Sequence, residues 1–250
     1  MLGRMLRRIR GMIQPWTERP GPRPSEGHRP EGSWLRETVF GANDGLVSNV
    51  ALVSGIAGGT GNPDFILLGG VAGLVAGAIS MSLGAYISTK SEREFRDAEE
   101  TRERWEIENL REQELAETRQ IFRLKGITGP LLDEVVDVVS RDHDQWIHLM
   151  MTDELGFPHA APRPVVSAII MGVAFAIAAF FPVAPYIFTE GSTALGTSLA
   201  LSGVALFGVG ALRAWITTGS MLFKGFEMVL LATVAVSIAF AIGQAVDVGV

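Results

Sequence analysis

The chain has 250 residues, of which 48% are hydrophobic and 19% are charged, and its formal net charge is −6 at pH 7. Soluble domains usually have about a quarter charged residues, so this composition argues against a single soluble domain. The sequence contains no cysteine, which excludes disulfide bonds and thiolate metal sites.

The charged residues are unevenly distributed along the chain. Residues 90–154 contain 18 acidic and 10 basic side chains, whereas Glu190 is the one charged residue between positions 164 and 212. Apolar stretches on both sides of a charged stretch indicate a membrane protein with a polar insert.

Residues 1–34 are expected to form a basic, Pro-rich N-terminal tail. Residues 1–13, MLGRMLRRIRGMI, place apolar side chains on one helical face and can form an amphipathic helix on an anionic membrane surface. A disordered basic tail explains the same residues equally well. These residues lack the apolar segment of a signal peptide. Residues 15–32 are rich in Pro and Gly and indicate a flexible linker.

Five segments are apolar over the roughly 20 residues that a helix needs to cross a bilayer. They are residues 38–59, 65–89, 164–185, 194–216 and 225–247. We therefore expect an all-α membrane protein with five transmembrane helices and a helical insert between the second and the third. The expected domains are residues 35–89 and 164–250 in the membrane, with residues 90–163 as the insert.

The positions of Lys and Arg indicate the orientation, because loops that carry them usually stay in the cytoplasm. Residues 1–38 contain eight Arg, and the insert and residues 213–224 also carry basic side chains. Residues 60–64 and 182–193 contain no Lys or Arg. The pattern predicts that the N-terminus and the insert are cytoplasmic and that the C-terminus lies on the far side.

The first predicted span contains an acidic residue, Asp44, with Asn43, Ser48 and Asn49 around it. A carboxylate in hydrocarbon is costly and usually faces an interior path or cavity. Asp44 is therefore a candidate residue of such a path.

The second predicted span has a stripe of small residues at steps of four, interrupted by one methionine. The stripe comprises Gly69, Gly73, Gly77, Met81 and Ala85. Small residues at this spacing are typical of close helix packing. Met81 fits either a gap-filling role or a soft metal ligand, and the pattern alone favours gap filling.

Acidic residues in the insert are regularly spaced. They form two Glu-x-x-Glu pairs, Glu103 with Glu106 and Glu114 with Glu117. In an unbroken helix all four would share a face, whereas a break near Asn109 would let two helices present the pairs to each other. Residues 131–151 predict a further helix, and Met150, Met151 and Glu154 lie close together at its end.

Two interpretations of this insert are equally supported by the spacing. Ion pairs such as Glu92–Arg96 and Glu100–Arg104 fit a solvated charged helix. The excess of eight acidic residues (18 minus 10) favours divalent cations instead, and thioethers shift the preference toward transition metals.

Several other functions are disfavoured. A di-iron oxidase needs Glu-x-x-His pairs, and none of the four histidines follows a Glu by three residues. No P-loop indicates an ATP-driven pump, and no nucleophile–base constellation indicates an enzyme. The acidic insert argues against nucleic-acid binding.

Three motifs occur in order along the chain: RETVFGANDGLVSN, GLVAGAISMSLGAYISTKSE and WIHLMMTDELG. On these motifs the sequence resembles the vacuolar iron transporter family, which exchanges cytosolic Fe²⁺, and often Mn²⁺, for protons. The resemblance covers roughly residues 35–247. It implies five transmembrane helices, a cytoplasmic three-helix metal-binding domain and a homodimer with the ion path near its interface.

The resemblance also implies roles for individual residues. Asp44 and Met81 correspond to the family's path-lining carboxylate and thioether, which reverses the gap-filling interpretation of Met81. The corresponding cytoplasmic iron ligands are Glu103, Glu106, Glu114, Glu117, Met150, Met151 and Glu154.

One position departs from the family pattern. Known iron–proton exchangers of the family carry a Glu two turns before the path methionine, where this chain has Gly73. Proton coupling would then rest on Asp44 alone or on another acid such as Glu227, which also fits an interfacial ion pair with Lys224. Alternatively, selectivity or coupling differs from that of the family.

We therefore expect a transporter that moves Fe²⁺, and Mn²⁺ as a further substrate, out of the cytosol by proton antiport. The metal is its substrate, and no tightly bound cofactor is expected. The alternatives are a metal-binding membrane sensor or scaffold without flux, and a transporter of another small cation. The composition, rich in Arg, Ala and Gly, favours a bacterial plasma membrane.

Overall fold

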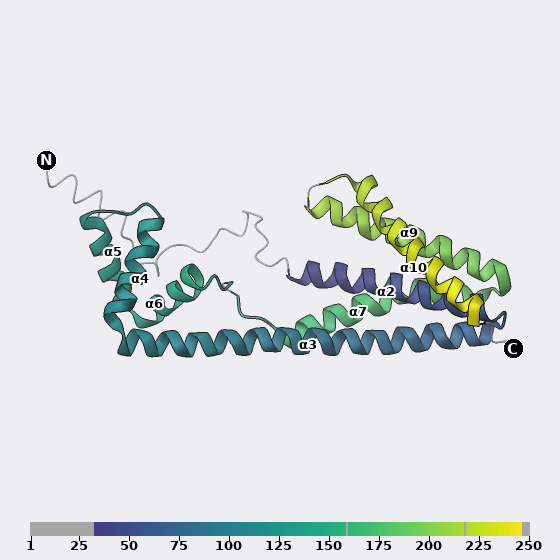
Figure 1. Cartoon of the computed structure of the whole chain (residues 1–250), viewed down its shortest axis with the longest axis horizontal. Helices are drawn as coiled ribbons and strands as arrows, with labels where there is room; N and C mark the ends of the chain where they lie inside the picture. The colour runs from purple at the N-terminus through teal and green to yellow at the C-terminus, as the bar shows by residue number, and fades with distance from the viewer. Residues whose placement is uncertain (1–32, 159, 218, 247–250) are drawn as a thin grey trace. The chain divides into compact units, whose positions relative to one another are not determined.

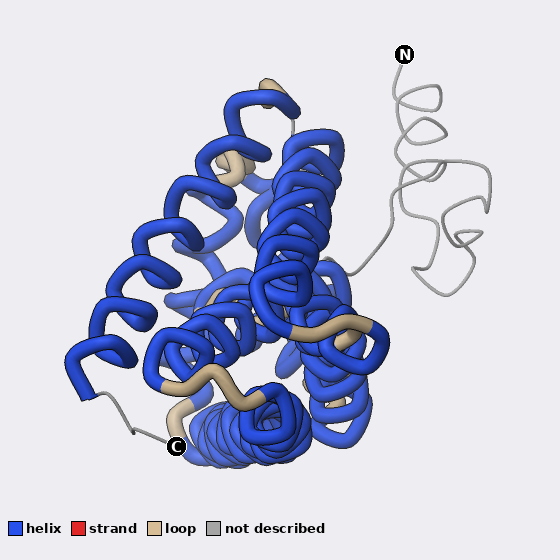
Figure 2. Tube along the Cα trace, turned by 90° about the vertical axis from the view of Figure 1, so that its right-hand side faces the viewer, coloured by secondary structure: helices blue, strands red, loops and turns tan. Residues whose placement is uncertain are grey.

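The computed structural model of the chain describes residues 33–246 except 159 and 218. The amphipathic segment and linker predicted within residues 1–32 lie outside this range. Throughout the described residues the regular structure is helical and contains no strand (Figure 2). Five of the helices are long and apolar enough to cross a membrane, which confirms the prediction of an all-α membrane protein with five such helices.

The first two spans are joined by a short turn. Helix α2 (Ser33–Gly59) is followed by α3 (Pro63–Asn109), a helix of 47 residues. The Asn62 side chain caps α3 by accepting a hydrogen bond of 2.9 Å from the Asp64 amide, and Pro63 occupies the first turn, where its missing N–H is not needed. Helix α3 continues without a break from its apolar first half into the charged insert (Figure 1).

The remaining spans follow the insert. They are α7 (Pro164–Val183), α9 (Gly191–Thr217) and α10 (Met221–Val246), with the short α8 (Pro185–Phe188) between the first two. All five predicted spans overlap these helices closely, because an uninterrupted apolar run of this length has no other stable form in a bilayer.

Helix α2 packs closely against three other spans through glycine. A Cβ added to Gly45 would lie 2.4 Å from the Phe175 carbonyl oxygen of α7. One added to Gly58 would lie 2.6 Å from the Phe240 carbonyl oxygen of α10, and one on Gly70 of α3 would lie 3.0 Å from Val53 of α2. These backbones could not approach so closely with larger residues, as expected for helices packed through small side chains.

The insert contains more breaks than expected. Helix α3 ends at Asn109 and α4 (Arg111–Leu124) begins two residues later, so the broken form of residues 90–125 is observed. The single helix predicted over residues 131–151 is wrong. It is divided into α5 (Pro130–Ser140), α6 (His143–Leu149) and a π-helical turn (Met150–Glu154). The cause is Asp142, whose Oδ1 accepts hydrogen bonds from the amides of Asp144 and Gln145 and so starts a new helix.

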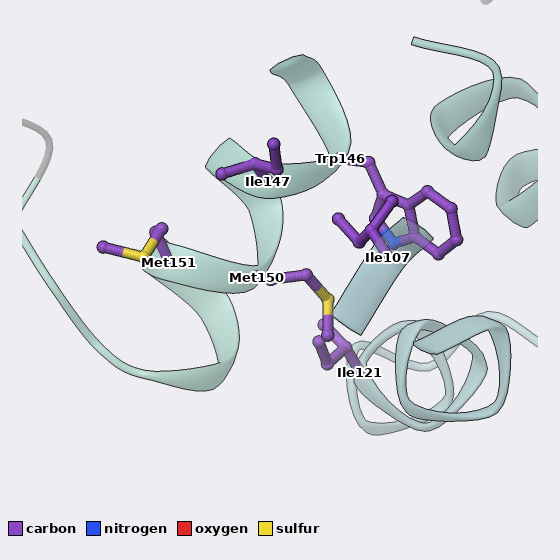
Figure 3. Close-up of a cluster of buried hydrophobic side chains, with 6 residues drawn as sticks. All are labelled: Ile107, Ile121, Trp146, Ile147, Met150 and Met151. Carbon is purple, nitrogen blue, oxygen red and sulfur yellow. The ribbon is translucent and has the colours of Figure 1, made fainter. Parts of the chain in front are cut away.

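The insert has an apolar core of its own. Its buried side chains come from α3, α4, α6 and the π-helical turn, and they are Ile107, Ile121, Trp146, Ile147, Met150 and Met151 (Figure 3). Trp146 is fully buried, and its indole N–H donates a hydrogen bond of 2.8 Å to Thr118 Oγ1. This satisfied indole fixes α6 against α4.

Candidate metal sites

A cavity of about 280 Å³ lies between α2, α3 and α7, within the apolar bundle. Asp44 from α2 and Met81 from α3 both contribute to its wall. The other lining residues are Ser48, Asn49, Leu52, Gly73, Gly77, Ser80 and Phe175. The two residues proposed for a transport path thus lie on one cavity, although they are far apart in the sequence.

Asp44 is the charged residue among those that line the cavity. The side chain is half-buried, and no ion pair neutralises it among the described residues. The neighbouring Ser48 Oγ donates to the backbone oxygen of Asp44 at 2.5 Å, so this hydroxyl is used within the helix. A negative group of this kind, open to a cavity in a span, is suited to a cation.

Asn49 supplies the cavity's most buried polar side chain, which is 1% exposed. Its Nδ2 donates to the backbone oxygens of Gly70 (3.3 Å) and Ala179 (2.7 Å), and its Oδ1 has no hydrogen-bond partner in the described structure. A buried acceptor without a partner costs about 1–3 kcal/mol. In the sequence, Asn49 stands near Asp44 without a signal that would predict a role for it.

Gly73 and Met81 lie on the α3 side of the cavity. A Cβ on Gly73 would lie 2.4 Å from Leu52 Cδ2 and 2.9 Å from Asn49 Oδ1, so the glycine leaves room for both α2 side chains. Met81 also lines a second cavity, of about 410 Å³, and therefore lies on both. This position is more open than that of a methionine that only fills a core gap.

The second cavity is lined by an acidic residue, Glu37, that was not among the predicted site residues. Glu37 is 8% exposed, and its Oε1 accepts a hydrogen bond of 2.6 Å from Ser167 Oγ of α7. Arg36 and Glu92 line the same cavity. The sequence did hold a signal, because Glu37 belongs to the first motif and precedes Asp44 by seven residues, about two helical turns.

In the insert, Glu103 of α3 and Glu114 of α4 are buried, at 4% and 3% exposure. One carboxylate oxygen of each, Oε2, has no hydrogen-bond partner in the described structure. Burial, followed by the negative charges of neighbouring glutamates, raises the pKa of both carboxyl groups to about 7. These neighbours include Glu106, Glu117 and Glu154, so the five predicted glutamates lie within electrostatic range of one another.

The other three predicted glutamate ligands, Glu106, Glu117 and Glu154, differ in their surroundings. Glu106 is partly buried and accepts a hydrogen bond of 3.0 Å from Arg102 Nε. Glu117 and Glu154 keep much of their surface exposed. Partial desolvation of the Glu154 carboxyl group, followed by the negative charges of Glu117 and Glu106, raises the pKa of Glu154. Across the described residues, no three His, Asp or Glu side chains are already close enough to hold a metal ion. A site built from these glutamates therefore requires side-chain rotation.

The two predicted methionine ligands belong to the apolar core. Met150 is fully buried and Met151 is 3% exposed. The Met150 sulfur lies 3.7 Å from Thr118 Oγ1. Figure 3 shows the Met150 side chain directed toward Ile121 and the Met151 side chain directed away from it. The two thioethers do not converge on one point in this arrangement.

Of the two predicted ion pairs, the structure contains one. Arg104 lies 3.5 Å from Glu100. Arg96 instead donates to the backbone oxygens of Pro158 (2.8 Å) and Ala160 (3.1 Å), which ties α3 to the segment that leads into α7.

Residues 35–244 of the chain match the VIT family. The chain belongs to this family. A protein of Arabidopsis thaliana named vacuolar iron transporter 1 is 31% identical over 225 residues, which cover 89% of this chain and 90% of the relative. A protein of the same name from Tulipa gesneriana is 31% identical over 215 residues, or 85% and 87% of the two chains. A vacuolar iron transporter of Toxoplasma gondii is 32% identical over 181 residues, or 71% of this chain and 55% of the relative.

The VIT family match spans both membrane cavities and the whole insert, so every candidate residue lies within it. This VIT family member is a multi-pass membrane protein with five apolar helices. Glu227, the alternative acid, is exposed on α10 and lines neither of the two cavities.

Proposed function

We propose that this protein transports Fe²⁺, with Mn²⁺ as a further substrate, out of the cytosol in exchange for protons. The observation that carries the proposal is the membrane cavity, where the Asp44 carboxylate and the Met81 thioether face one space. A carboxylate offsets part of the cost of a divalent ion in the membrane. A thioether favours transition metals over Mg²⁺. The names of the relatives from Arabidopsis thaliana and Tulipa gesneriana support iron as the substrate.

Proton exchange follows from the chemistry of a single carboxylate. Asp44 must lose its proton to bind a cation, so the cation and the proton compete for one side chain. Alternating access of that side chain to the two faces of the membrane then gives antiport. The cavity of Glu37 and Glu92 adjoins Met81 and serves as the vestibule between the cytosol and Asp44.

The insert, residues 90–163, collects metal from the cytosol in this proposal. Its ligands are Glu103, Glu106, Glu114, Glu117, Met150, Met151 and Glu154. Support comes from the buried, unpartnered oxygens of Glu103 and Glu114, for which a divalent cation is a suitable partner. The N-terminus and the insert are cytoplasmic, the membrane is a bacterial plasma membrane, and two copies form the transporter.

The test is Fe²⁺ uptake into sealed liposomes that contain the purified protein, with and without a pH gradient. We expect uptake that depends on the gradient and falls to the level of protein-free liposomes in Asp44→Ala, because the path then has no charge to offset that of the ion. Asp64→Ala is the matched control, since Asp64 is exposed in the first turn of α3 and outside the cavity. Full transport by Asp44→Ala would contradict the proposed path.

A metal-binding sensor or scaffold without flux is the second candidate. Gly73 favours it, because the family position that carries a path glutamate has no side chain here. Metal binding by the wild-type protein without any uptake, at any pH gradient, would select this function instead.

A further inference from the structure

The amide of Asn49 has a fixed orientation in the membrane cavity. Its Nδ2 donates to two backbone oxygens, those of Gly70 in α3 and Ala179 in α7. Both partners are acceptors only, so a flipped amide would direct Oδ1 against two carbonyl oxygens. The hydrogen bonds therefore assign the amide oxygen, and not its NH₂ group, to the remaining side.

That remaining side is the side of Gly73, which lines the same cavity as Asp44 and Met81. Asn49 lines the cavity, is 1% exposed, and keeps Oδ1 without a hydrogen-bond partner in the described residues. A buried acceptor is stabilised only by a donor or a cation. A cation held by Asp44 is the charged species that this cavity is suited to accept.

Gly73 places no side chain over the Asn49 oxygen. A Cβ at position 73 would lie 2.9 Å from Oδ1, and even a methyl group there would cover it. The nearest other atom is Leu52 Cδ2 at 2.4 Å, the end of a side chain that can rotate away.

We propose that Asn49 Oδ1 is an uncharged third ligand for the divalent transition metal in the membrane path, beside the Asp44 carboxylate and the Met81 thioether. This inference rests on the proposed function. An amide oxygen adds a ligand without adding charge, so the ion bound by one carboxylate keeps a net charge of +1 (+2 minus 1). Compared with a site of two carboxylates, a site with one carboxylate and one neutral oxygen binds its ion more weakly and releases it more readily.

The experiment measures Mn²⁺ uptake into sealed liposomes as a function of Mn²⁺ concentration, because Mn²⁺ resists oxidation by air. Asn49→Ala should raise the KM about tenfold, as loss of one interaction with a charged group does. Ser54→Ala is its matched control. Ser54 Oγ is also buried without a partner and lies on α2, but outside the cavity.

A second pair of variants leaves Asn49 in place and decides the question if Asn49→Ala does not fold. Gly73→Ala should raise the KM, because its methyl group covers Oδ1. In Gly69→Ala the methyl group meets a similar obstacle, Ile56 Cδ1 at 2.3 Å, but lies outside the cavity. Its KM should stay close to the wild-type value.

The outcomes separate this inference from the proposed function. A raised KM in Asn49→Ala and Gly73→Ala, with both controls unchanged, supports the third ligand. Wild-type KM values in these two variants would overturn it and leave the transport function intact. Equal increases in Gly73→Ala and Gly69→Ala would assign the effect to packing and also overturn it. Absence of uptake by the wild-type protein would instead refute the proposed function.

Discussion

In the membrane cavity one carboxylate, Asp44, shares a space of about 280 Å³ with an amide oxygen and a thioether. In the insert, five glutamates lie within electrostatic range of one another around an apolar core. The cavity thus brings three different side chains to one space, with one formal charge among them. The insert has abundant charge, but in the described residues no three carboxylates are already grouped for a metal.

This difference has consequences for binding. A site with few ligands and one negative charge holds an ion weakly and lets it leave, which suits a step in a transport path. Crowded carboxylates repel one another, and a divalent cation relieves that repulsion when they rotate toward it. We therefore expect loss of the Asp44 carboxylate to abolish uptake at every metal concentration, and loss of the insert's carboxylates to reduce uptake chiefly at low metal concentration.

The double variant Glu103→Gln with Glu114→Gln is expected to have the largest effect, a loss of metal binding by the insert. Loss of two buried carboxylates should weaken metal binding by the purified protein at least about 100-fold, since each interaction with a charged group contributes about 1.5–3 kcal/mol. Uptake should fall at low metal concentration and approach the wild-type rate at saturation. Equilibrium binding and concentration-dependent uptake measure the two effects.

Glu134→Gln is the control for this double variant, because Glu134 is exposed on α5 and outside the predicted ligand set. Uptake that falls equally at all metal concentrations would assign Glu103 and Glu114 a structural role and remove the contrast between the two regions.

A smaller effect concerns the stability of the metal-free insert. The folded-state pKa of Glu103 and Glu114 is about 7, well above the ordinary 4.5. Between these two values the folded insert binds more protons than the unfolded chain, so its stability should rise as the pH falls from about 7 to 4.5. At pH values above both, the two ionised carboxylates destabilise the folded insert.

Hydrogen exchange of residues 103–121 in the presence of a chelator measures this dependence locally. We expect slower exchange, after correction for the intrinsic rate, at pH 5.5 than at pH 7.5. The double Gln variant should be protected at both values. A stability that rises with pH over this range would contradict the raised pKa values.

The sequence pattern was sufficient for the spans and for Asp44, because apolar length and an isolated acid are local signals. Met81 was assigned to the path by the family resemblance, whereas the pattern alone favoured gap filling. It could not give the orientation of Asn49, which depends on carbonyl oxygens 21 and 130 residues away. The break after Ser140 was missed because a capping Asp142 in a charged stretch resembles any other acidic residue. Spacing also suggested adjacent thioethers at positions 150 and 151, whereas the π-helical turn directs them apart.

The smallest expected effect separates two roles for those methionines. Met150→Leu and Met151→Leu conserve volume, so each should change the stability by less than about 1.5 kcal/mol. If the thioethers rotate to bind metal, each variant should weaken Fe²⁺ binding several-fold and leave Mg²⁺ binding unchanged, because Leu removes only the soft ligand. Thermal unfolding and competition between Fe²⁺ and Mg²⁺ measure both quantities. Unchanged Fe²⁺ affinity in both variants would restrict the methionines to the core and leave the glutamates as the insert's metal ligands. The thioether ligand would then belong to the membrane cavity, and the insert would bind metal through carboxylates alone.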